Sequence, residues 1–67
     1  MKEFVYVVKG TIRHFDGQKD QTIVSVHKVE THANCAGYDW ARYQNERMHL
    51  ENLKSHASYE VFRFPLE

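Results

Sequence analysis

Hydrophobic residues are consecutive in the first segment of the chain, where residues 4–8 are all apolar or aromatic. A strand with apolar side chains on both faces is usually central in its sheet and buried on both sides. Beyond residue 8 every second position turns polar, so the second face is apolar only at Val5 and Val7. We therefore predict a central strand over residues 2–14 with a compact second apolar patch near its start.

A hairpin follows this strand, because Asp16-Gly17 is a strong turn signal and a second strand-like segment covers residues 20–30. A two-residue loop would place Val24 and Val26 on the face of the compact patch, whereas a three-residue loop would place them on the other face. We prefer the two-residue loop, because it sets oppositely charged residues and two threonines across from each other. The alternate residues then share the first strand's other face: Ile23, Ser25, His27 and Val29.

One helix is predicted over residues 40–55, with Asp39 as its N-cap and residues 31–38 as the loop before it. Asn34 offers an earlier start. Four apolar residues fall on one arc of this helix, at Tyr43, Leu50, Leu53 and Ala57. We expect that arc to pack on the sheet, although Glu46 interrupts it.

A last strand is predicted over residues 59–64, before Pro65, which has no backbone N–H for a sheet. The element order ββαβ places the first strand between the other two. We predict a single α+β domain over residues 1–67, with a three-stranded antiparallel sheet in the order 2-1-3 and one helix packed on one face. The other sheet face then needs a cover from outside the chain.

Composition limits how a chain of 67 residues is stabilised. So small a core often needs disulfides, a metal or oligomerisation, and Cys35 is the only cysteine, which fits a reducing compartment. There is no signal-peptide pattern and no apolar stretch near the roughly 20 residues of a membrane helix. We expect a soluble cytoplasmic protein without a membrane partner. Nine basic and nine acidic residues lower the expectation of a dedicated nucleic-acid binder.

Metal and nucleophile chemistry receive little support from the spacing of candidate residues. His32 and Cys35 stand three apart, which a zinc site can use, but no paired CxxC or HxxxH completes a ligand set. On a continuous helix His49 and His56 lie about 10 Å apart, too far to share one ion. We expect no metal, no cofactor and no catalytic activity.

The alternative function is a small nucleic-acid-binding protein or a toxin-like ribonuclease. His27 would act as the acid–base group, and basic side chains of the hairpin would hold phosphate. These basic residues are Lys9, Arg13, Lys19 and Lys28.

The leading hypothesis is a protein-binding module whose partner is a second copy or a foreign protein. Its contact residues would lie on the uncovered sheet face, at Val5, Val7, Val24 and Val26. The aromatic pair Tyr38 and Trp40, where the loop meets the helix, forms a second candidate, because Tyr and Trp dominate interface hot spots.

The layout also resembles a known class of small proteins. The chain starts Met1-Lys2, enters a strand that ends Tyr6-Val7-Val8-Lys9, and continues as hairpin, helix and strand. In length and layout the whole chain resembles small phage-encoded proteins, among them inhibitors of CRISPR surveillance complexes. The resemblance implies a non-enzymatic protein in the host cytoplasm that blocks a host complex by occupying its nucleic-acid-binding or assembly surface.

Overall fold

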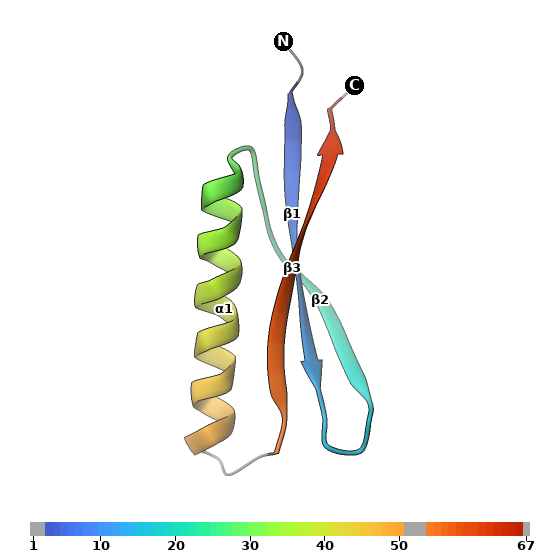
Figure 1. Ribbon diagram of the computed structural model, residues 1–67, viewed down its shortest axis with the longest axis vertical. Helices are drawn as coiled ribbons and strands as arrows, with labels where there is room; N and C mark the ends of the chain where they lie inside the picture. Colours follow the sequence, from blue (N-terminus) through green and yellow to red (C-terminus); the bar gives the residue numbers. More distant parts are fainter. Residues whose placement is uncertain (1–2, 51–53, 67) are drawn as a thin grey trace.

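The computed structural model describes residues 3–50 and 54–66, and its elements follow the order ββαβ (Figure 1). They are β1 (Phe4–Arg13), β2 (Lys19–His27), α1 (Glu30–Leu50) and β3 (His56–Pro65). The strands form one antiparallel sheet in the order β2-β1-β3, and α1 packs against it. The predicted α+β class and the central position of the first strand are therefore confirmed.

The hairpin loop is one residue longer than the preferred prediction. The backbone N–H of His14 donates to the carbonyl of Gln18 (2.8 Å), and that of Gly17 donates to the carbonyl of His14 (3.0 Å). These bonds enclose a three-residue loop, and Gly17 has a φ of 92°, a conformation that glycine adopts without strain. The prediction of a two-residue loop is wrong.

The register shifts once more between Val8 and Lys9, where Val24 is an extra residue in β2. Val7 lies opposite Val26, as the preferred register predicts, but Lys9 lies opposite Ile23. The extra loop residue and the extra strand residue offset each other, so only the part of β2 near the loop changes face. Ile23 consequently joins the face of Val7 and Lys9, against our prediction.

Helix α1 begins at Glu30, ten residues before the predicted start, and residues 31–38 are helical instead of a loop. Gly37 does not break the helix because it is a packing residue: a Cβ there would overlap the ring of Tyr59 in β3. Residues 51–53, which the prediction assigned to the helix, lie outside the described residues. Strand β3 begins at His56, earlier than predicted, so Ala57 belongs to the sheet.

The core lies between α1 and one face of the sheet. Its buried hydrophobic residues within the described part of the chain are Val8, Ala33, Met48 and Ala57. Trp40 lies over Gly10 of β1 so closely that a Cβ would overlap the indole. The predicted helix arc is wrong, since Tyr43 and Leu50 are exposed and Leu53 lies outside the described residues. The helix approaches the sheet through Ala33, Trp40 and Met48 instead of the predicted arc.

Asn45 ties α1 to the outer edge of β3. Its side-chain oxygen accepts from the backbone N–H of Ala57 (2.8 Å), and its amide nitrogen donates to the carbonyl of the same residue (3.1 Å). Both backbone groups of Ala57 therefore point away from β1. This contact satisfies part of a strand edge that would otherwise be open to pairing.

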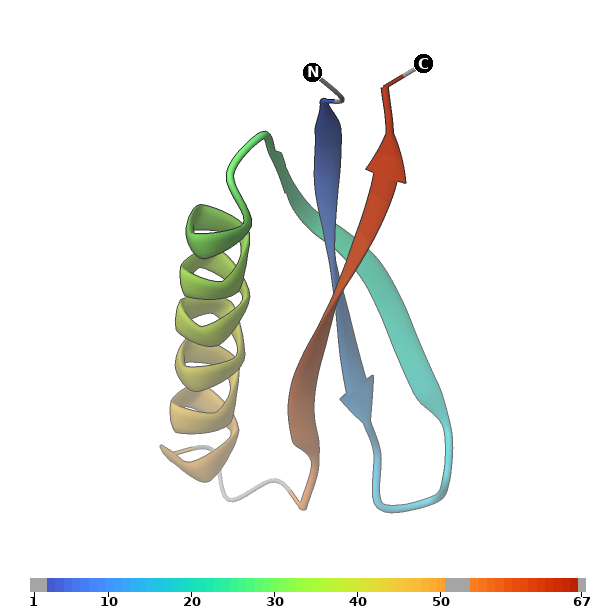
Figure 2. The ribbon, with the colours of Figure 1, turned by 45° about the horizontal axis from the view of Figure 1, so that its top comes forward.

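Helix α1 runs along one side of the sheet, and no element of the described residues covers the other side (Figures 1 and 2). The start of β1 and the end of β3 lie side by side and project past the first turn of α1 (Figure 1). The molecule extends 48 Å along its longest axis. A helix with the length and apolar character needed to cross a membrane is absent from the described ranges.

Candidate functional site

The candidate site is the sheet face that α1 leaves uncovered, which we call the open face. Gly10 and Val8 face the helix, because Trp40 lies over Gly10 and Val8 is 0% exposed. Side chains alternate between the faces of a strand, so the odd-numbered residues of β1 point to the open face. Their cross-strand partners share that face with them.

The half of the open face near the start of β1 is apolar. Val5 lies opposite Phe64, and Val7 lies between Val26 and Phe62. With Ile23 in the next row, these residues form the apolar patch: Val5, Val7, Ile23, Val26, Phe62 and Phe64. The exposed fractions are 60% for Ile23, 55% for Val26, 50% for Phe64 and 38% for Phe62. A contiguous exposed apolar patch of this kind is a candidate interaction surface.

The half of the open face near the hairpin is polar and basic. Arg13 lies between Lys19 and His56, and these three residues form the basic row. Lys9 lies at the border of the two halves, with Glu60 opposite it in β3 and its ammonium group 5.9 Å from the ring centroid of Phe62. The open face therefore changes along the strands from aromatic and aliphatic to cationic.

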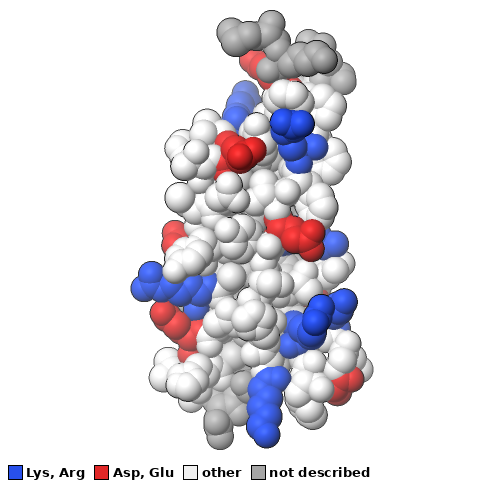
Figure 3. Space-filling view, viewed as in Figure 1, with Lys and Arg blue, Asp and Glu red and all other residues white. Residues whose placement is uncertain are grey.

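Charge is mixed on the side of the molecule that Figure 3 shows. Figure 3 shows Lys and Arg side chains in small groups, interspersed with Asp and Glu and separated by wide uncharged areas. Arg42 and Glu46 form an exposed ion pair on α1 (3.2 Å), and the hydrogen bond to Glu46 raises the pKa of the Arg42 guanidinium. The side of the molecule seen in Figure 3 thus carries no broad field of one sign.

The structure separates the six predicted contact residues into different surroundings. Val5, Val7 and Val26 meet in the apolar patch, and Val24 is the half-buried extra residue beside it. Trp40 is also half-buried, over Gly10 on the helix side of the sheet.

Tyr38 is exposed on α1, in the other layer of the molecule from the open face. It lines a shallow groove along the helix with Arg42, Asn45 and His49. The two predicted surfaces, the sheet face and the aromatic pair, therefore do not form one site.

Three members of the apolar patch were missing from the predicted contact set: Ile23, Phe62 and Phe64. The alternation Tyr59, Val61, Arg63 against Glu60, Phe62, Phe64 in the last strand gives both faces apolar members, so the sequence pattern does not say which one the helix covers. Ile23 lies on the open face instead of the predicted opposite face, because the hairpin loop is one residue longer than predicted. The period of two shows that Phe62 and Phe64 share one face of the strand, but it does not show which face.

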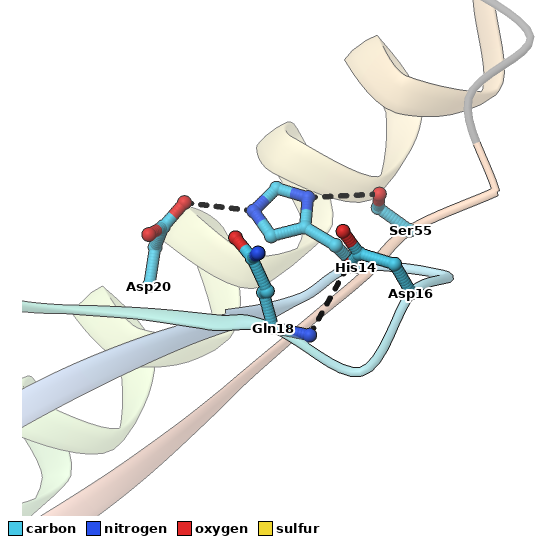
Figure 4. Close-up of polar contacts among 5 residues, drawn as sticks. All are labelled: His14, Asp16, Gln18, Asp20 and Ser55. Carbon is cyan, nitrogen blue, oxygen red and sulfur yellow. Dashed lines mark hydrogen bonds and ion pairs between the residues drawn. The ribbon is translucent and has the colours of Figure 1, made fainter.

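A chain of polar contacts joins the hairpin to the segment before β3 (Figure 4). The imidazole of His14 lies between Asp20 (Nε2 to Oδ2, 2.7 Å) and the hydroxyl of Ser55 (Nδ1 to Oγ, 3.3 Å). The carboxylate only accepts, so Nε2 carries the proton and donates to Asp20. The residue types match a serine–histidine–aspartate triad, but the Asp20 side chain is 76% exposed and is not held in a desolvated site.

The ribonuclease candidates do not converge. His27 lies opposite Tyr6 on the helix side of the sheet and contacts the hydroxyl of Ser25 (2.8 Å). Lys9 and Arg13 point to the open face. The sheet therefore separates His27 from Lys9 and Arg13, whereas Lys28 follows His27 in the chain and lines a hollow with Tyr6.

The candidate zinc residues lie on the helix. His32 and Cys35 are both exposed in α1, where the prediction had a loop. Within residues 3–50 and 54–66 no three side chains of the metal-binding types are grouped as a metal site.

Comparisons of the chain with protein-family models, with curated protein sequences and with solved structures gave no match. The functional argument therefore rests on the geometry of the open face.

Proposed function

We propose that this chain is a protein-binding module without catalytic activity, and that it binds its partner through the open face. The observation that supports this proposal is the apolar patch, in which two phenylalanines and two β-branched residues are exposed side by side. Buried aromatic side chains dominate the affinity of protein interfaces, and here they surround the half-buried pair Val5 and Val7.

The basic row gives this surface a polar rim on one side. An apolar centre with a charged border is the usual anatomy of a protein–protein contact. The exposed position of Asp20 argues against nucleophilic catalysis by Ser55 with His14 as its base, because such chemistry needs a fixed, desolvated geometry. A binding function accounts for both the apolar patch and the basic row of the open face.

The test is retention of proteins from a host extract on immobilised chain, compared with two variants. Phe62→Glu places a charge in the apolar patch, and Gln21→Glu places the same charge on the open face outside the patch. We expect Phe62→Glu to lower affinity by about 30-fold or more and Gln21→Glu to change it less than about threefold. Equal retention by Phe62→Glu, with a circular dichroism spectrum unchanged from the parent chain, would contradict the proposal.

Single-stranded nucleic acid is the second candidate ligand, because Lys9 and the basic row share the open face with Phe62 and Phe64. Aromatic side chains on a sheet stack with bases, and nearby cations hold the phosphates. This hypothesis predicts binding of a homopolymeric RNA oligonucleotide that weakens steeply with salt and weakens further in Arg13→Ala. Absence of binding at low salt would remove it.

The blocking of a host complex, which the resemblance to phage-encoded inhibitors implies, stays a prediction. An inhibitor of this kind would use the apolar patch to occupy a surface of the complex. Loss of inhibition in Phe62→Glu, with inhibition kept in Gln21→Glu, is the expected result in an assay of the complex.

A further inference from the structure

The core of this chain is small compared with the apolar surface that it leaves exposed. Two of the four buried hydrophobic residues in the described part of the chain are alanines, Ala33 and Ala57. Phe62 and Phe64, which are larger than any of the four, stay on the open face. A chain of this length with one cysteine has no internal disulfide, so burial of the apolar patch is its available source of further stability. A second copy is the one partner that is present wherever the chain is present.

Symmetry limits how two copies can place their open faces together, because a closed dimer has a twofold axis. With the axis parallel to the strands, each row meets its own equivalent, so the basic row of one copy faces the basic row of the other. That arrangement sets Arg13 and Lys19 against like charges, which is unfavourable.

A second possible twofold axis also lies between the two sheets but runs perpendicular to the strands, between the rows of Val5 and Val7. This axis avoids the repulsion. The Val5 row of one copy then faces the Val7 row of the other, and Phe64 faces Phe62. The two basic rows lie at opposite outer ends. Face-to-face sheets pack about 10 Å apart, which the side chains of the apolar patch would fill.

The same axis sets Lys9, which has Glu60 beside it in β3, against Glu3 of the other copy at both ends of the apolar patch. Lys9 follows Val7 by two residues in β1, and Glu3 precedes Val5 by two and lies just before the strand. The N–H of Leu66 donates to the carbonyl of Glu3 (3.0 Å), so the pairing with the last strand continues to this position and the period of two assigns Glu3 to the open face. Lys9 of each copy therefore faces Glu3 of the other. Within one copy these residues are six apart, about 20 Å along the strand, so they do not pair internally.

We infer that the open face binds a second copy of this chain, in a twofold dimer whose central strands run antiparallel, with the apolar patches in contact and Lys9 paired with Glu3 across the interface. This inference rests on the proposed function and names the partner. It uses the apolar patch and the charge pattern of the first strand together, because the perpendicular axis satisfies both and the parallel axis does not.

The first test is the mass of the full chain in solution, by light scattering or sedimentation equilibrium over a concentration series. We expect twice the 8.0 kDa of one chain at about 100 μM. Phe62→Glu should weaken dimerisation by about 30-fold or more, and Gln21→Glu by less than about threefold. A parent chain that stays monomeric at this concentration would overturn the inference.

The second test is a charge exchange, which distinguishes this dimer from other ways of covering the patch. Lys9→Glu and Glu3→Lys should each weaken dimerisation by about tenfold, because the twofold axis repeats each repulsion twice. The double variant should return to within about twofold of the parent chain. A double variant as weak as the sum of its single changes would contradict the proposed axis even if a dimer exists, and this test needs no substitution in the apolar patch.

The results also separate this inference from the proposed function. A monomeric chain that loses a foreign protein partner in Phe62→Glu contradicts the dimer and supports the binding module. A monomeric chain that binds no protein and binds single-stranded RNA in a salt-dependent way contradicts both.

Discussion

The two faces of the sheet differ in a way that side-chain hydrophobicity does not explain. The covered face meets α1 through Gly10, Ala57 and the ring of Tyr59, whereas the open face carries Phe62 and Phe64. A helix approaches a sheet closely only where small residues leave room for both backbones. Burial in this chain thus follows the places where glycine leaves room for the rings of Trp40 and Tyr59, and Phe62 and Phe64 stay exposed on the open face.

The substitution expected to disturb the packing of α1 on the covered face most strongly is Gly37→Val, because a Cβ at this position overlaps the ring of Tyr59. We expect a loss of about 3 kcal/mol in the free energy of unfolding, since overpacking forces helix and sheet apart. Urea unfolding measures it. Cys35→Val, at an exposed position of the same helix, is the control and should change stability by less than about 0.5 kcal/mol. Equal effects of the two substitutions would show that Gly37 is not a packing residue.

A matched pair of truncations compares the two faces directly. Val8→Ala removes methyl groups from a side chain that is 0% exposed and should cost about 2 kcal/mol. Ile23→Ala, on the open face, should cost less than about 0.5 kcal/mol when unfolding is measured at a protein concentration low enough to exclude association. If both truncations cost the same in the monomer, the assignment of the faces is wrong.

Loss of the hydrogen bonds between α1 and the edge of β3 should have a smaller effect on the free energy of unfolding. Asn45→Ala removes two hydrogen bonds to the backbone of Ala57 and should cost about 1–2 kcal/mol. Thermal unfolding with Asn34→Ala as the control measures it, because Asn34 is an exposed helical asparagine and its replacement should be neutral or slightly stabilising. Faster hydrogen exchange of the Ala57 amide in Asn45→Ala would give independent support.

The smallest expected effect is a gain in stability on the open face. Lys19→Glu replaces a like-charge pair with an opposite-charge pair across from Arg13, and it should stabilise the chain by about 0.5 kcal/mol. The gain should shrink at high salt, because exposed charges are screened. Lys28→Glu, outside the strands, carries the same charge change as a control. A salt-independent gain would show that the effect is not electrostatic.

Much of the fold could be predicted from local patterns. The consecutive apolar residues of the first strand indicated its central place, and Asp16-Gly17 located the hairpin to within one residue. The helix start was missed because Asn34 and Gly37 are frequent breakers, and only the ring of Tyr59, which comes from a distant strand, explains a glycine inside a helix.

The candidate site was predictable at Val5, Val7 and Val26 and not at the phenylalanines. The last strand has apolar residues on both faces, so its pattern does not indicate which face the helix covers. Ile23 changed face because one extra residue in the loop was offset by one extra residue at Val24. A loop of one more residue costs little free energy, and local sequence therefore does not distinguish the two registers.

The sequence by itself determined the ββαβ order, the central first strand and the position of an apolar patch near its start, because these follow from side-chain period and turn chemistry within short segments. Only the tertiary structure decided which face α1 covers and which aromatic residues join the patch. That choice depends on close contacts between residues distant in the chain, Gly10 with Trp40 and Gly37 with Tyr59. Such a contact forms only where a large ring meets a residue without a side chain, and the pattern within one segment does not show which distant residue it will meet.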